Sequence, residues 1–222
     1  ERVSRYGIGR HAAGEHLPRH RHAEGYVALV LAGDYDEAGD EGRLTAAPGT
    51  VVIHDRWAAH QDHFGARGAQ VLNLPALPGL AAGTGKVADP DSIARLAERD
   101  ALAAAELVQA SFRPDASPVR DWPDLLADTL RSDPDTALAC WAEGIGIDPA
   151  SLSRGFARVY GVTPKRFRLE ARTRRAVLAH EVGHIMSGHP TYTTLAVILL
   201  AIGVANIPAL ATLAVLPFEL AL

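Results

Sequence analysis

Cysteine is nearly absent from this sequence of 222 residues, in which Cys140 has no second cysteine to pair with. An internal disulfide and a multi-cysteine zinc site are therefore excluded, and a reducing compartment is favoured. Aromatic residues are also few, at 6%, whereas 48% of the residues are hydrophobic and 22% are charged. This composition is typical of a globular protein and excludes disordered and fibrous classes. The start, ERVSRYGIGRH, lacks an initiator Met and the pattern of a signal peptide, so we expect a cytoplasmic protein or a fragment of one.

Charge is unevenly distributed along the sequence, whose net charge is −4. Residues 1–139 carry a net charge of −7, residues 140–178 carry +5 and residues 179–222 carry −2. A compact basic block favours a nucleic-acid surface, because phosphate groups need positive charge only where they bind. A solvated basic face is the alternative that charge alone leaves open.

The sequence divides into segments with different hydrophobic patterns. Residues 1–77 contain short apolar runs separated by Gly, Pro and Asp, which is typical of a small antiparallel barrel or sandwich. Residues 78–90 have no periodicity and are predicted to be a linker. Apolar residues at three- and four-residue spacing then predict helices over 91–112 and 122–132.

A helix-turn-helix is predicted next. We expect a first helix over 135–143, a turn over 144–147, and a second helix with Asp148 as N-cap and Pro149 at its first position. One face of the second helix is apolar and can pack, while basic and hydroxyl side chains remain for contacts with DNA bases and phosphates. These side chains are Ser151, Ser153, Arg154, Arg158, Lys165 and Arg166. A helical hairpin with an exposed basic face is the alternative.

The same region resembles the first of the two helix-turn-helix units of AraC-family transcription regulators, on the stretch LSRGFARVYGVTPKRFRLEARTRRAVLA. The matching positions are Leu152, Ser153, Arg154, Phe156, Gly161, Thr163 and Pro164. The resemblance implies major-groove recognition by residues around Ser151, Ser153, Arg154 and Arg158. A second unit does not follow, so a homodimer is expected to recover specificity.

The N-terminal strands resemble a cupin barrel, in which a glycine, an HxH pair and a later glycine mark two paired strands. The residues that fit are Gly14, His20, His22 and Gly33. Tyr26 stands at the usual glutamate position. Together with His60, the two histidines could form a three-imidazole metal site. Contact with an organic effector and plain polarity at the barrel mouth are the alternatives.

A further resemblance begins near residue 179, where an HExxH motif occupies 180–184. On a helix, His180 and His184 share a face and could bind one zinc ion while Glu181 polarises a bound water. With the apolar stretch that follows, HEVGHIMSGH resembles the zinc helix of HtpX-like gluzincin metallopeptidases. The resemblance implies that His180 and His184 are ligands and that Glu181 is the general base.

The third zinc ligand of that family is a glutamate on a later helix, in an ExxxD setting. Glu219 is the only carboxylate that follows Glu181 in this sequence, and its neighbours differ from that setting. His189 would be a different kind of ligand. An inactive helix with polar histidines is therefore the alternative to a competent peptidase.

No charged residue occurs over 190–218. Residues 195–216 alone could span a bilayer core, which is about 30 Å thick. Asn206 and Pro208 interrupt the stretch and argue against a smooth transmembrane helix. Membrane insertion, a packing or oligomer interface, and an aggregation-prone fragment all remain open.

As a whole, the sequence predicts a multidomain α and β protein, in which an antiparallel β cupin-like barrel precedes an all-α helix-turn-helix domain and an apolar C-terminal helical segment. The expected divisions are the barrel at 1–77, the linker at 78–90, linker or dimerisation helices at 91–132, an AraC-like helix-turn-helix at 133–178 and an HExxH-containing tail at 179–222. The expected function is effector-responsive, sequence-specific DNA binding with an incomplete second unit, and the alternative is a zinc-dependent metalloendopeptidase. The expected partners are DNA, a small-molecule effector, a second copy of the chain, and a membrane contacted through residues 190–218. Zinc is the candidate cofactor.

Overall fold

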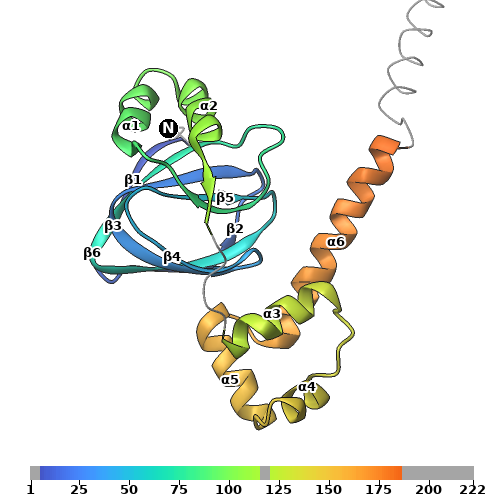
Figure 1. The fold of residues 1–222 in the computed structure, drawn as a ribbon. Helices are drawn as coiled ribbons and strands as arrows, with labels where there is room; N and C mark the ends of the chain where they lie inside the picture. The colour runs from blue at the N-terminus through green and yellow to red at the C-terminus, as the bar shows by residue number, and fades with distance from the viewer. Residues whose placement is uncertain (1–5, 116–120, 187–222) are drawn as a thin grey trace, which may run out of the picture. The chain divides into compact units, whose positions relative to one another are not determined.

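The computed structural model of the protein describes residues 6–115 and 121–186 (Figure 1). The chain forms two compact units, residues 1–174 and 175–222. Within the described residues, no helix combines the length and the apolar character needed to cross a membrane. The apolar stretch 190–218, with its predicted membrane contact, lies outside the described residues.

The described strands form one eight-stranded antiparallel sheet, which confirms the antiparallel β fold predicted for the N-terminal part. The strands are β1 Gly7–His11, β2 His16–Arg21, β3 Tyr26–Gly39, β4 Gly42–Ala46, β5 Thr50–His54, β6 Ala59–Pro75, β7 Gly83–Lys86 and β8 Arg113–Pro114. Their order is β1-β6-β3-β5-β7-β8, with β2 paired to β6 and β4 paired to β3. The sheet is strongly curled (Figure 1).

The pairing of β3 with β6 depends on a glycine. Gly33 has a φ of +72°, in the left-handed region that favours glycine. A Cβ atom at Gly33 would lie 1.8 Å from the carbonyl oxygen of Gly68. The two strands therefore approach so closely that no side chain fits between them, and the register shifts on both sides of this point.

Successive residues of β3 belong to different apolar clusters, as the two-residue period of a strand requires. Val27 and Leu29 lie in a cluster with residues of α1 Pro90–Ala97 and α2 Ala101–Ser111, which cover that face of the sheet. Ala28 and Val30 lie in a second cluster within the sheet itself. Both faces of β3 are thus buried.

The connection between sheet and helices differs from the sequence prediction in two ways. Within the predicted linker 78–90, β7 pairs with β5, because backbone hydrogen bonds form a strand without any hydrophobic pattern. The predicted helix 91–112 is divided into α1 and α2. The reason is Asp100, whose carboxylate accepts hydrogen bonds from the backbone N–H groups of Leu102 and Ala103 and begins a new helix.

After the unplaced residues 116–120, the described chain is helical. The helices are α3 Trp122–Ser132, α4 Leu138–Gly144, α5 Pro149–Tyr160 and α6 Pro164–Met186. The predicted bounds of α3 and the predicted cap of α5 are confirmed, since the Asp148 carboxylate accepts a hydrogen bond from the Ser151 backbone N–H. The α4 helix begins three residues later than predicted.

The helices enclose an aromatic core. The rings of Phe156 and Tyr160 stack at 4.7 Å, and Phe167 meets each of them edge-on at 5.4 Å. Leu126, Leu130 and other apolar residues of α3 to α5 complete the cluster. This core fixes α5 and the first turns of α6 against α3.

Polar contacts also join the sheet to the helices within the first unit. The Arg19 Nε on β2 donates a hydrogen bond of 3.0 Å to Glu170 Oε2 on α6, and Arg19 also pairs with Asp40. The Gln61 side-chain amide donates a hydrogen bond of 2.7 Å to the carbonyl oxygen of Val159 on α5. The strands that carry the predicted metal ligands are therefore in direct contact with α5 and α6.

Candidate functional site

Four histidine rings form one cluster on the curled sheet, in which His54 and His60 are buried, His20 is half-buried and His22 is exposed. His20 lies on β2, His22 follows that strand, His54 ends β5 and His60 lies near the start of β6. The ring centroids of His20, His22 and His54 lie 4.4, 5.5 and 4.5 Å from that of His60. The structure brings together the three histidines predicted from the sequence, whose ligand atoms lie within 4.8 Å of one another. Metal binding by this set stays a prediction.

Two members of the cluster were missed by the sequence analysis. Glu37, His54 and His60 form a second group with ligand atoms within 4.8 Å of one another, and His54 Nε2 lies 3.6 Å from Glu37 Oε2. These three residues are 5%, 4% and 3% exposed. In the sequence, Glu37 stands in the acidic stretch DYDEAGDEG, which suggests a solvated hairpin. The signal that could have identified it is the alternation of apolar and polar residues along β3.

Burial determines the protonation of the cluster. Burial, with the neighbouring His22 and His20, lowers the pKa of His54 to about 3, and burial with the neighbouring histidines lowers the pKa of His60 to about 2. Burial and the nearby Asp62 and Glu41 raise the pKa of Glu37 well above its usual value. Burial raises the pKa of Asp62 to about 7. Near neutral pH the two histidines are uncharged and available as ligands.

Tyr26 lies against the cluster from β3. Its ring stacks on His54 at 4.4 Å, and its hydroxyl lies 3.4 Å from His60 Nε2. The residue at the usual glutamate position of the cupin pattern thus reaches the cluster, but it offers a phenol in place of a carboxylate. Burial, followed by Glu37 and Asp62, raises the pKa of this phenol, so it remains protonated.

Some polar atoms of the cluster lack partners within the described part of the chain. His60 Nδ1 and Asp62 Oδ1 are buried and accept or donate no hydrogen bond there. Buried polar atoms without a partner are costly and mark places where a ligand or ion can bind. The shared histidine of both groups therefore has a ring nitrogen free for a ligand.

A cavity of about 400 Å³ opens beside the cluster. Its polar lining includes His20, His22, Tyr26, Glu37 and Asp62. Its apolar lining comes from side chains such as Leu17, Phe64 and Val71. This mixture of apolar walls and a few convergent polar groups is typical of a small-molecule or metal site.

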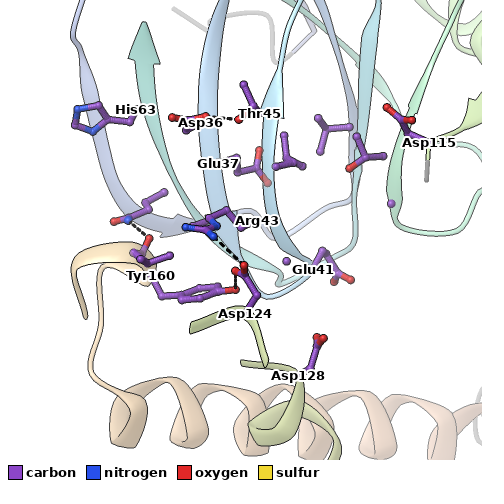
Figure 2. A pocket seen from close by; sticks show the side chains of 18 of the residues that line it. Asp36, Glu37, Glu41, Arg43, Thr45, His63, Asp115, Asp124, Asp128 and Tyr160 are labelled. Carbon is purple, nitrogen blue, oxygen red and sulfur yellow. Dashed lines mark hydrogen bonds and ion pairs between the residues drawn. The ribbon is translucent and has the colours of Figure 1, made fainter. Parts of the chain in front are cut away.

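A larger cavity of about 790 Å³ lies between strands and helices of the first unit (Figure 2). Figure 2 shows Asp124 bonded to both Arg43 and Tyr160, and these hydrogen bonds are 2.9 and 2.8 Å long. Asp36 accepts a hydrogen bond of 2.5 Å from Thr45, and Asp128 pairs with Arg131. The carboxylates of this cavity are largely occupied by partners from the protein itself.

The predicted DNA-contacting residues lie on α5 and the start of α6. Ser151, Arg154, Arg158, Lys165 and Arg166 are exposed, and Ser153 is half-buried. The opposite face of α5 is buried in the aromatic core. Some of the six are engaged within the protein, since Arg166 Nε donates a hydrogen bond of 2.8 Å to Glu170 and Arg154 donates one of 3.2 Å to the Ser151 hydroxyl.

The HExxH motif lies on the last turns of α6. The backbone is helical through Met186, so His180 and His184 stand four residues apart on one helix, and His180 is exposed. Residues 187–222, which include His189 and Glu219, lie outside the described residues. The motif therefore has the local backbone that zinc binding requires.

A comparison with protein families matches residues 167–216 to peptidase family M48. The matched range contains the whole HExxH motif and supports the metallopeptidase interpretation of this segment. It begins at Phe167, twelve residues before the boundary expected from the sequence, and so includes most of α6. The match covers 50 of the 222 residues. No curated protein matches the chain.

Several solved structures share part of the sheet. Salicylate 1,2-dioxygenase from Pseudaminobacter salicylatoxidans is 17% identical, with 30% of this chain and 20% of that chain covered and a TM-score of 0.29. A cupin superfamily protein from Desulfitobacterium hafniense is 18% identical, with coverages of 32% and 66% and a TM-score of 0.28. A protein of unknown function from Rhizobium leguminosarum is 28% identical, with coverages of 32% and 68% and a TM-score of 0.29. The chain spans about a fifth of the dioxygenase, and likenesses of this extent do not assign it to a family.

Proposed function

We propose that the C-terminal segment acts as a zinc metallopeptidase element, with His180 and His184 as zinc ligands and Glu181 as general base. The observation that carries this proposal is the match to peptidase family M48 across the motif. The helical backbone of α6 supports it, because residues four apart on a helix can bind one ion. A zinc ion held by His180 and His184 would supply a bound water of lowered pKa, and Glu181 would accept the proton of that water for attack on a peptide carbonyl.

The test is zinc content and proteolysis of the purified chain. We expect His184→Ala to hold about one zinc ion per chain fewer than the parent. Glu181→Gln should keep the zinc and abolish hydrolysis of an unfolded protein such as casein. His22→Ala is the matched control, because it removes an imidazole from the other histidine cluster. Zinc that is indifferent to His184→Ala, or proteolysis that survives Glu181→Gln, would reject the proposal.

Two further variants test which residue is the third zinc ligand. Glu219→Gln and His189→Gln remove the two candidate ligands in the sequence that follows the motif. If one of them completes the site, that variant alone should lose the zinc ion that His184→Ala loses. Retention of zinc in both would place the third ligand elsewhere.

A second candidate function is DNA binding by α5. The observation that favours it is the exposed row of Ser151, Arg154 and Arg158 on a helix whose other face is buried. Lys165 and Arg166 extend this basic surface at the start of α6. Arginine suits bidentate contact with guanine, and lysine suits phosphate.

An effector in the 400 Å³ cavity could control such binding through β2. His20 lines the cavity, while its neighbour Arg19 is hydrogen-bonded to Glu170 on α6. An effector would shift the population of DNA-competent arrangements by its differential affinity for them. In a homodimer, the second copy of the chain would supply a second DNA-binding helix.

The DNA-binding proposal is tested by electrophoretic mobility shift at several salt concentrations. Arg154→Ala and Arg158→Ala should each cost about 1–3 kcal/mol of binding free energy, and removal of an arginine that binds phosphate should reduce the salt slope by about one. Arg99→Ala is the matched control, because Arg99 is exposed near the end of α1, away from this surface. Binding that does not depend on salt, or that is equally weakened in the control, would reject the role of α5.

A further inference from the structure

We propose that the buried group Glu37, His54 and His60 binds a divalent first-row transition-metal ion within the curled sheet. Two imidazoles and one carboxylate are a donor set that suits Zn²⁺, Fe²⁺, Co²⁺ and Mn²⁺. Their ligand atoms already lie within 4.8 Å of one another, so one ion can reach all three without rearrangement of the backbone. This group differs from the histidine set predicted from the sequence, with which it shares His60.

The three residues are held by the centre of the sheet. Glu37 lies on β3, His54 on β5 and His60 on β6, and β3 pairs with both other strands. In these ladders Tyr26 is opposite His54, and Gly39, two residues from Glu37, is opposite His60. Backbone hydrogen bonds to β3 therefore hold the strands that carry His54 and His60, and the Glu37 carboxyl group of β3 lies 3.6 Å from His54.

The alternative set of His20, His22 and His60 is less firmly held. Its strand β2 pairs with β6 across a register shift between Leu17 and His20, and His22 lies beyond the end of β2. His22 is exposed and His20 is half-buried, whereas Glu37 and His54 are both buried. Ligands that are rigid and shielded from water lose less entropy and bind metal more tightly.

The presence of a buried carboxyl group also favours this group over the three-imidazole set as the metal site. Within the described chain, the uncharged His54 lies 3.6 Å from Glu37 Oε2, and no lysine or arginine pairs with that carboxyl group. Burial raises the pKa of Glu37, and a divalent ion bound there would take the place of the carboxyl proton and compensate the buried negative charge. The three-imidazole set has no carboxylate and gains no such compensation.

The surroundings fit a metal with open coordination positions. Glu37 also lines the 400 Å³ cavity, which could admit water or a small ligand to the ion. The Tyr26 hydroxyl lies 3.4 Å from His60 Nε2, and Asp62 Oδ2 lies 3.8 Å from the same atom. His60 Nδ1 has no hydrogen-bond partner among the described residues.

The experiment is a titration of the full chain with Co²⁺, followed by calorimetry and by the visible ligand-field bands of the bound ion. All proteins carry His180→Gln and His184→Gln, so the result does not depend on the peptidase proposal. We expect about one Co²⁺ per chain. Glu37→Gln and His54→Gln should each weaken binding at least tenfold and change or abolish the bands.

His22→Gln and His63→Gln are the matched controls, because they remove one histidine of the alternative set and one histidine outside both groups. Both should bind Co²⁺ within about threefold of the parent affinity. Loss of binding in His22→Gln, with retention in Glu37→Gln and His54→Gln, would overturn the proposal in favour of the three-imidazole set. Absence of binding in the parent would also overturn it.

Circular dichroism and thermal unfolding identify the variants that remain folded. Glu37→Gln and His54→Gln probe the same site from different strands, so either folded variant decides the result. If neither folds, Glu37→Asp replaces them, because it keeps the charge but shortens the ligand. We expect it to alter the ligand-field bands, and unchanged bands and affinity would overturn the proposal.

Discussion

The curled sheet and the helical part of the first unit both have apolar clusters, but they differ in the other side chains that they bury. The helices enclose the stacked and edge-on rings of Phe156, Tyr160 and Phe167. The interior of the sheet instead buries Glu37 and His60 together with other titratable groups. Apolar packing stabilises a fold directly, whereas buried ionisable groups lower its stability unless a ligand compensates them.

The two regions also differ in how completely their buried polar atoms are hydrogen-bonded. In the helical part, the buried Asp124 accepts hydrogen bonds from Tyr160 and Arg43. In the sheet, His60 Nδ1 and Asp62 Oδ1 lack such partners within the described residues. The Nε atoms of Arg168 and Arg174 on α6 also lack a partner there, but both guanidinium groups form hydrogen bonds through another nitrogen. Proteins depart from full satisfaction mainly at functional sites, so the contrast identifies the sheet interior as the region shaped by binding and the helical core as the region shaped by stability.

The largest expected effect is in the helical core. Phe156→Ala should lower the free energy of unfolding by about 3–5 kcal/mol, because it leaves a cavity among fully buried side chains. Ile145→Ala is the control, since Ile145 is an exposed apolar residue between α4 and α5, and it should cost far less. Denaturant unfolding measures both. Equal losses would mean that the aromatic cluster is not the stabilising core.

A substitution in the sheet interior should instead raise the free energy of unfolding. Asp62→Asn should raise the free energy of unfolding by ~2–3 kcal/mol near pH 8, because the wild-type carboxylate is charged and buried there. The folded pKa of Asp62, about 7, lies above its unfolded value of 3.8. The wild-type protein therefore loses stability as pH rises through 7, and this loss is absent below the unfolded pKa.

The advantage of Asp62→Asn should consequently disappear near pH 4. Denaturant unfolding of the metal-free protein at both pH values measures it. Asp91→Asn, at an exposed position in the first turn of α1, is the control and should show no such gain. An advantage that does not depend on pH would refute the assignment to Asp62 ionisation.

A smaller loss is expected at the polar contact of the helical core. Tyr160→Phe should cost about 1–2 kcal/mol, because it removes the hydrogen bond of 2.8 Å that the Tyr160 hydroxyl donates to Asp124. A double-mutant cycle with Asp124→Asn isolates the pair, and additive losses would show that the hydrogen bond contributes nothing.

The smallest effect concerns the surface of α5. Arg154→Ala should change the free energy of unfolding by no more than about 0.5 kcal/mol, because the side chain is exposed. Its bond to Ser151 is a hydrogen bond of 3.2 Å on the surface. Thermal unfolding measures the change, and a loss above 1 kcal/mol, roughly a fivefold shift in the equilibrium, would place Arg154 in the packing.

Local patterns in the sequence were sufficient for the elements that local interactions form. Asp148 and Pro149 predicted the start of α5, since a cap and a first-turn proline act within one turn of chain. HExxH was visible for the same reason, because its residues are neighbours on one helix. The antiparallel fold followed from short apolar runs separated by turn residues.

Long-range pairing explains what the sequence did not reveal. The strand β7 forms because β5 offers it a backbone edge, and its residues Gly83–Lys86 have no strand pattern. Glu37 lies eleven residues along β3 from Tyr26, the residue that pairs with His54, yet its carboxyl group lies 3.6 Å from His54, and no fixed spacing in the sequence encodes that meeting. A site built from separate strands becomes visible only when the sheet is known.

Because β3 and β6 approach each other closely at Gly33, any substitution of this residue should disturb the sheet. A single methyl group would collide with the Gly68 carbonyl and force the two longest strands apart. Both candidate ligand groups depend on β6, and Glu37 lies four residues beyond Gly33 on β3. The geometry of the histidine cluster therefore depends on Gly33, a residue that takes no part in the chemistry of the cluster, because only a hydrogen atom fits in place of a side chain there.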